Sequence, residues 1–60
     1  MNNDLLTLST TLLDFVTMFT NNCAKGTISP ADKRSLYVTL DAIKAQTILI
    51  NNELDNVGDE

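Results

Sequence analysis

Apolar side chains recur at alternating steps of three and four residues between positions 4 and 25. This spacing places them along one side of an α-helix, so the pattern predicts a helix over residues 4–25. A strand is the alternative, because the segment is rich in threonine, but strict alternation of polar and apolar residues fails at Leu5-Leu6 and Leu12-Leu13. The predicted buried stripe consists of Leu5, Leu8, Leu12, Phe15 and Phe19.

A second helix is predicted over residues 30–56. Its start is marked by Ser29-Pro30-Ala31-Asp32, in which Ser29 and Asp32 can each accept a hydrogen bond from the other's main-chain N–H. Pro30 suits the first helical position because its missing N–H would have no partner there. Apolar residues at helical spacing, interrupted by Thr47, then predict a buried seam of Leu36, Leu40, Ile43, Ile50, Leu54 and Val57.

The connection between the two helices is predicted at residues 26–29. Lys25 places a cation at the negative end of the first helix, and Gly26 can take the left-handed conformation that ends many helices. A loop this short returns the chain antiparallel. We therefore expect an all-α fold, one helical-hairpin domain over residues 1–60, with Asn2 or Asn3 as its first cap and a frayed acidic tail at 57–60.

The predicted helices carry more apolar side chains than one hairpin buries. The run Ile48-Leu49-Ile50 covers nearly the whole circumference of its helix, which is typical of a turn buried on several sides. A two-fold dimer forming a four-helix bundle would cover this surplus, and so would a helix of another protein. Simple exposure is the alternative. The candidate interaction residues are Leu6, Leu13, Val16, Tyr37, Val38, Ile48 and Leu49.

Charge is segregated along the predicted hairpin. The chain has 4 basic and 8 acidic residues, a net charge of −4, and the acidic excess lies in its last eight residues. Three of the four basic residues, Lys25, Lys33 and Arg34, gather at the loop end. An antiparallel homodimer would set each basic loop beside the acidic termini of the other copy, so we expect that orientation. The residues that define the two ends are Lys25, Lys33, Arg34, Glu53 and Asp55.

The sequence offers little chemistry. It contains no histidine and one cysteine, Cys23, so it lacks the usual general base, a zinc ligand set and any internal disulfide. We expect Cys23 to be a small buried apolar residue, and we expect no enzyme and no catalytic, metal-binding or cofactor-binding residue. Asp14 interrupts the longest apolar stretch and no signal peptide is visible, so we expect a cytoplasmic protein without a membrane segment.

These features favour a small non-enzymatic protein–protein interaction module, a regulator, inhibitor or adaptor, acting as a helical dimer or completed by a partner helix. Tyr37 is its expected anchor. A hairpin of this size with a dimeric core is also similar in architecture, though not in sequence, to the Rop-like four-helix-bundle regulators. That resemblance implies RNA binding, which the net negative charge disfavours. The further alternative is a self-assembling structural subunit or a secretion co-chaperone.

Overall fold

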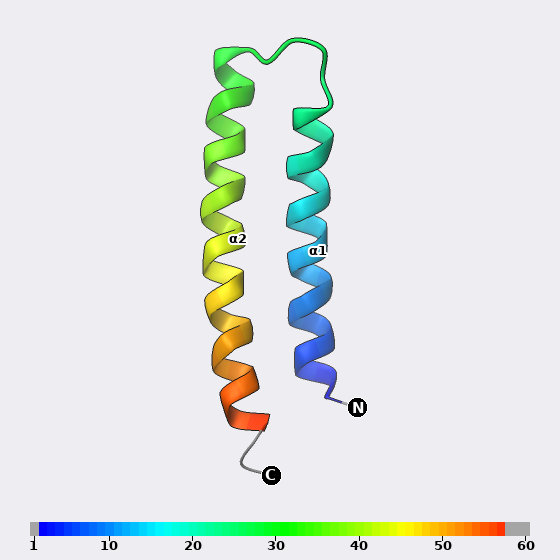
Figure 1. The fold of residues 1–60 in the computed structure, drawn as a ribbon, viewed down its shortest axis with the longest axis vertical. Coiled ribbons are helices and arrows are strands. Elements are labelled where there is room, and N and C mark those ends of the chain that lie inside the picture. The colour runs from blue at the N-terminus through cyan, green and yellow to red at the C-terminus, as the bar shows by residue number, and fades with distance from the viewer. Residues whose placement is uncertain (1, 58–60) are drawn as a thin grey trace.

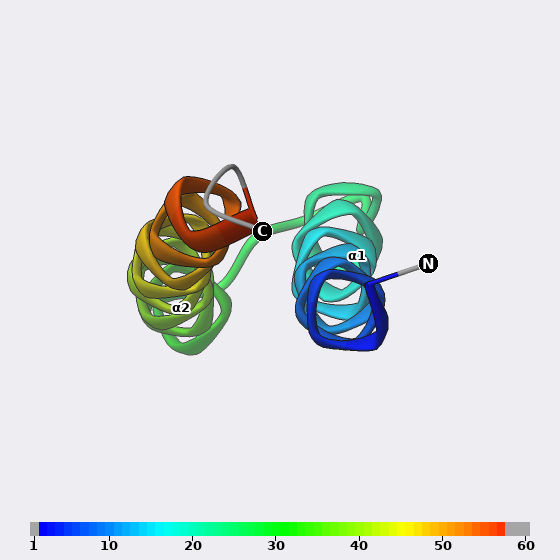
Figure 2. The same cartoon turned by 90° about the horizontal axis from the view of Figure 1, so that it is seen from below.

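The computed structural model describes residues 2–57 as two antiparallel helices, α1 (Asn3–Cys23) and α2 (Pro30–Val57), joined by residues 24–29 (Figure 1). The predicted all-α hairpin is therefore confirmed. Viewed along their axes, the helices lie side by side in a single layer (Figure 2). The Cα atoms span 48 × 17 × 10 Å, so the molecule is a flat rod with two broad faces.

Capping and threonine hydroxyls explain why the first segment is helical. Of the two expected caps, Asn2 is the one used: its side chain accepts a 2.9 Å hydrogen bond from the N–H of Leu5. Asp4 lies in the first turn, where the helix dipole favours an acid. Four of the five threonine hydroxyls of α1 donate to carbonyl oxygens four residues earlier, which satisfies them inside a helix. Those threonines are Thr10, Thr11, Thr17 and Thr20.

The end of α1 differs from the prediction. The helix stops at Cys23, and its cap is Ala24 in an ordinary right-handed conformation with φ of −75°. Gly26 does not adopt a positive φ, so the expected left-handed glycine cap is wrong. Lys25 lies beyond the helix and reaches Asp32 instead, with 2.8 Å between its Nζ and the Asp32 Oδ1. The connection is therefore two residues longer than predicted, at residues 24–29.

The start of α2 is the predicted reciprocal cap. The N–H of Asp32 donates to the Ser29 Oγ at 3.1 Å, and the N–H of Ser29 donates to the Asp32 Oδ2 at 3.1 Å. The Ser29 hydroxyl also donates to that carboxylate oxygen at 3.0 Å. Pro30 is the first helical residue. At the other end α2 continues through Val57, and residues 58–60 of the expected tail lie outside the described residues.

The seam of α1, meaning the row that faces α2, contains the predicted Leu5, Leu8, Leu12, Phe15 and Phe19, all half-buried. The predicted seam of α2 is wrong in phase. Leu40 and Leu54 are 40% and 52% exposed, whereas Thr39 and Gln46 are each only 7% exposed. The observed row consists of Leu36, Thr39, Ile43, Gln46, Ile50, Glu53 and Val57.

The bulk of the α1 side chains accounts for this shift. The Gln46 Nε2 donates to the Leu8 carbonyl oxygen at 2.9 Å, which fixes the level at which the helices face each other. Both helices rise by the same distance per residue and run in opposite directions. Counting the same number of residues from Leu8 and from Gln46 therefore places Phe15 level with Thr39, and Phe19 level with Ser35. Phe15 thus lies level with a small seam side chain, Thr39, whereas Ser35 is exposed beside the seam. The polar residues are satisfied in place, because the Thr39 hydroxyl donates to the Ser35 carbonyl oxygen at 2.8 Å.

Candidate interaction surface

The hairpin leaves its apolar side chains exposed or half-buried. No apolar residue among positions 2–57 is buried, although many are half-buried along the seam. All seven predicted interaction residues are exposed, from 41% at Val16 to 66% at Val38. Four further large apolar side chains that the sequence reading did not single out as interaction residues are also exposed: Met18, Ile28, Leu40 and Leu54.

Helix geometry sorts these side chains onto the two broad faces. Each residue turns about 100° from the one before it, so residues that follow and precede a seam position lie on opposite flanks. In an antiparallel pair, the residues that follow the seam positions of both helices, here called followers, lie on the same broad face. The leucine face is the face of these followers, and its exposed leucines and valine are Leu6, Leu13, Val16, Leu40 and Leu54. It also carries Tyr37, which follows Leu36, and Lys44, which follows Ile43.

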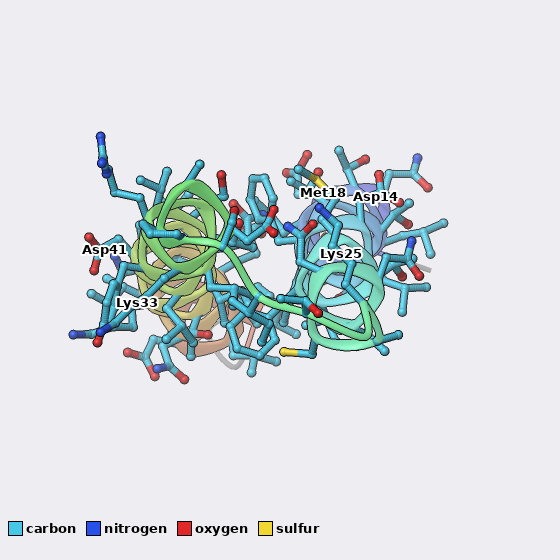
Figure 3. The ribbon with its side chains drawn as sticks, turned by 90° about the horizontal axis from the view of Figure 1, so that it is seen from above. Asp14, Met18, Lys25, Lys33 and Asp41 are labelled. Carbon is cyan, nitrogen blue, oxygen red and sulfur yellow. The ribbon has the colours of Figure 1, made fainter. Side chains whose placement is uncertain are left out.

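The opposite broad face, here the Met18 face, carries the exposed apolar residues Met18, Val38 and Leu49, each directly before a seam position. An open groove of about 480 Å³ runs along it near the loop end. Met18 and Lys33 lie on opposite sides of the hairpin (Figure 3), as expected for a residue before Phe19 and a residue after Asp32. The groove is lined by Met18, Asn22, Ala31, Arg34, Ser35, Val38 and Thr39.

The two faces differ in what α1 contributes. The residues preceding its seam positions include Asp4, Thr7, Thr11 and Asp14, with Met18 as the one apolar member among the described residues. The residues following its seam positions carry no charge: Leu6, Ser9, Leu13, Val16 and Thr20. On α1, only the leucine face is therefore free of charge. On α2 the same face carries Lys44 midway along the helix.

A third exposed region lies on the side of α2 turned away from α1. Ile48 is 60% exposed there. The same side carries the charged residues Asp41 and Asp55, both exposed, so it is interrupted by charge. Tyr37 is 59% exposed and follows the seam residue Leu36, which places it on the leucine face.

The two ends of the hairpin carry opposite charge. At the loop end Lys25 pairs with Asp32, while Lys33 and Arg34 are exposed. Hydrogen bonds from the Lys25 ammonium and from the main chain and hydroxyl of Ser29 lower the pKa of Asp32 to about 2, so this carboxylate stays ionised. At the other end lie the acidic residues Asp4, Glu53 and Asp55.

No cluster of three or more histidine, cysteine, aspartate or glutamate side chains within residues 2–57 could hold a metal ion. Cys23 is exposed at the end of α1, so its expected burial is wrong. The reason is the early end of the helix, where α2 does not cover this side chain. Within the same range, neither helix combines the length and the hydropathy needed to cross a membrane.

No protein-family model matches the chain, and comparison with curated proteins and with solved structures finds no match either.

Proposed function

We propose that this chain is a small non-enzymatic protein–protein interaction module that works in association, as a helical dimer or with a partner helix completing its core. The supporting observation is that the described hairpin buries no apolar side chain fully while exposing large ones on both helices. A contiguous apolar surface on a small soluble domain is typical of an interaction site.

The energetics support the same proposal. Helices of this length depend on packing of their apolar faces, and domains below about 70 residues gain only about 3–5 kcal/mol from their own core. Burying a leucine or valine that is half exposed contributes on the order of 1 kcal/mol. Covering the five leucine and valine side chains of the leucine face would therefore add a stabilisation comparable to that from the whole core of such a domain.

A dilution series tests the proposal. The mass in solution and the helicity would be followed together, by light scattering and far-ultraviolet circular dichroism, from high micromolar to nanomolar concentration. We expect a mass above that of one chain at high concentration and a loss of helicity on dilution, because folding is coupled to association. A monomer that stays fully helical and unfolds cooperatively at every concentration would overturn the proposal.

A further inference from the structure

We infer that the occupant of the leucine face is a second copy of this chain, packed antiparallel about a two-fold axis to form a four-helix bundle. This inference rests on the proposed function and names the partner at that surface. It leaves the Met18 face, with its groove, on the outside of the bundle.

The composition of the faces selects the leucine face. A two-fold interface places the same surface on both copies, so that surface must be apolar across its width. The leucine face comes nearer to this condition, because both helices contribute exposed large apolar side chains to it, with Leu13 at 63% exposure near its centre and Lys44 as the charged residue midway along α2. The Met18 face would instead bring together the Asp4, Thr7, Thr11 and Asp14 side chains of α1, which are acidic or polar.

The size of the face fits a second copy. Its 48 by 17 Å extent between Cα atoms is an area of about 800 Å², which equals the roughly 800 Å² per partner that a stable protein–protein interface buries. The two hairpins have equal lengths by definition, so their broad faces match from end to end. A single partner helix, about 10 Å wide, would cover only part of the width.

Charge selects the antiparallel orientation. The loop end carries Lys33 and Arg34, which form no ion pair within residues 2–57, and the opposite end carries Glu53 and Asp55. Antiparallel packing brings each basic end beside an acidic end of the other copy, whereas parallel packing places like charges together at both ends. On α2, the end that carries Lys33 in one copy lies beside the end that carries Asp55 in the other.

The exposed Cys23 allows the orientation of the two copies to be measured on a chain without any substitution. A nitroxide attached there sits ten residues beyond Leu13, about 15 Å along the axis. In the antiparallel bundle the labels of the two copies are at least about 30 Å apart, because they lie at opposite ends. In a parallel bundle they lie at the same end, separated by about two helix diameters, or 20 Å, or less.

Two matched substitutions identify the face. Leu13→Asn changes the leucine face, and Val38→Asn changes the Met18 face at a side chain of nearly equal exposure, 63% against 66%. We expect Leu13→Asn to raise the dimer dissociation constant more than tenfold, because the change enters the interface twice. We expect Val38→Asn to change it less than threefold.

A second matched pair reports on the charged ends. Lys33→Glu and Lys44→Glu alter the net charge equally, but Lys33 lies at the loop end and Lys44 near the middle of α2. Lys33→Glu should weaken the antiparallel dimer severalfold more than Lys44→Glu does, and adding Asp55→Lys to it should restore affinity. In a parallel dimer Lys33→Glu would instead strengthen association, since it removes repulsion between the basic ends.

The outcomes separate this inference from the proposed function. A chain that associates with labels closer than about 20 Å, or that is weakened more by Val38→Asn than by Leu13→Asn, overturns the inference and leaves the interaction module intact. A chain that stays a fully helical monomer at all concentrations would overturn both the inference and the proposed function. If Leu13→Asn does not fold, the label distance on the unsubstituted chain still decides the orientation.

Discussion

The side chain of Gln46 in α2 donates a 2.9 Å hydrogen bond to the main-chain carbonyl oxygen of Leu8 in α1. Gln46 is 7% exposed, so this bond lies inside the contact between the helices. It is the single side-chain hydrogen bond joining α1 to α2 within residues 2–57, and it fixes which turns of the two helices lie at the same level. A buried polar residue with one specific partner is a known way to specify register.

Substitution of Gln46 should separate packing from hydrogen bonding. Gln46→Ala is expected to lower the free energy of unfolding by about 1–3 kcal/mol, since it leaves a gap in the seam and removes the donor. Gln46→Leu should stay within about 1 kcal/mol of the native chain, because it refills the space with an apolar group. Denaturant unfolding at one fixed protein concentration measures both. Equal losses for the two variants would show that the hydrogen bond itself carries the stability.

The Ser29 cap predicts a second effect. Ser29→Ala should lower the free energy of unfolding by about 1 kcal/mol, because the N–H of Asp32 loses its acceptor at the start of α2. Ser35→Ala is the control: the same change at an exposed position inside the same helix should raise stability by a few tenths of a kcal/mol. Thermal unfolding of both variants provides the comparison, and similar behaviour would argue against the cap.

Acid should weaken the hairpin through Asp32. Its folded-state pKa of about 2 lies below the value of about 3.9 for an unfolded aspartate, so ionised Asp32 stabilises the fold. That stabilisation is fully present above about pH 4 and is lost as the pH falls toward 2. Observation of the Asp32 carboxyl by nuclear magnetic resonance should give a midpoint near 2. A midpoint near 4 would mean that the contacts with Lys25 and Ser29 do not persist in solution.

Gly26 offers a stabilising substitution. A Cβ added there meets no atom within 4 Å, and the residue does not adopt a positive φ. Gly26→Ala should therefore raise the free energy of unfolding by about 0.4–1 kcal/mol, because alanine restricts the unfolded chain without straining the loop. Thermal unfolding measures the change. A loss of stability would indicate that the loop uses a left-handed glycine after all.

Local chemistry made most of the fold predictable. The reciprocal contacts of Ser29 and Asp32 and the cap at Asn2 depend on residues close in sequence, and the structure contains them as expected. The buried stripe of α1 was also predictable, because its apolar side chains follow one phase. The Gly26 conformation was not, since Ala24 ends the helix first and leaves the glycine without a structural requirement.

The rotation of α2 could not be read from its own sequence. Two phases with the same spacing share Leu36, Ile43, Ile50 and Val57, and they differ in whether Leu40 or Thr39 turns inward. Hydrophobicity alone favours Leu40. The choice depends on the facing helix, where Phe15 lies level with the small Thr39 and the Leu8 carbonyl oxygen accepts a hydrogen bond from Gln46. That information belongs to the pair of helices. The same rotation places Leu40 and Leu54 on the leucine face, which the sequence reading therefore missed.

The threonine hydroxyls of α1 have a consequence for anything that touches its outer side. Thr10 and Thr17 each already donate the hydroxyl proton to a carbonyl oxygen of their own helix. What these groups present outward is therefore lone pairs alone. A molecule that contacts them must supply the hydrogen-bond donors. Amide-rich or hydroxyl-rich surfaces are therefore suited to this side of α1, and carboxylate-rich surfaces are disfavoured there.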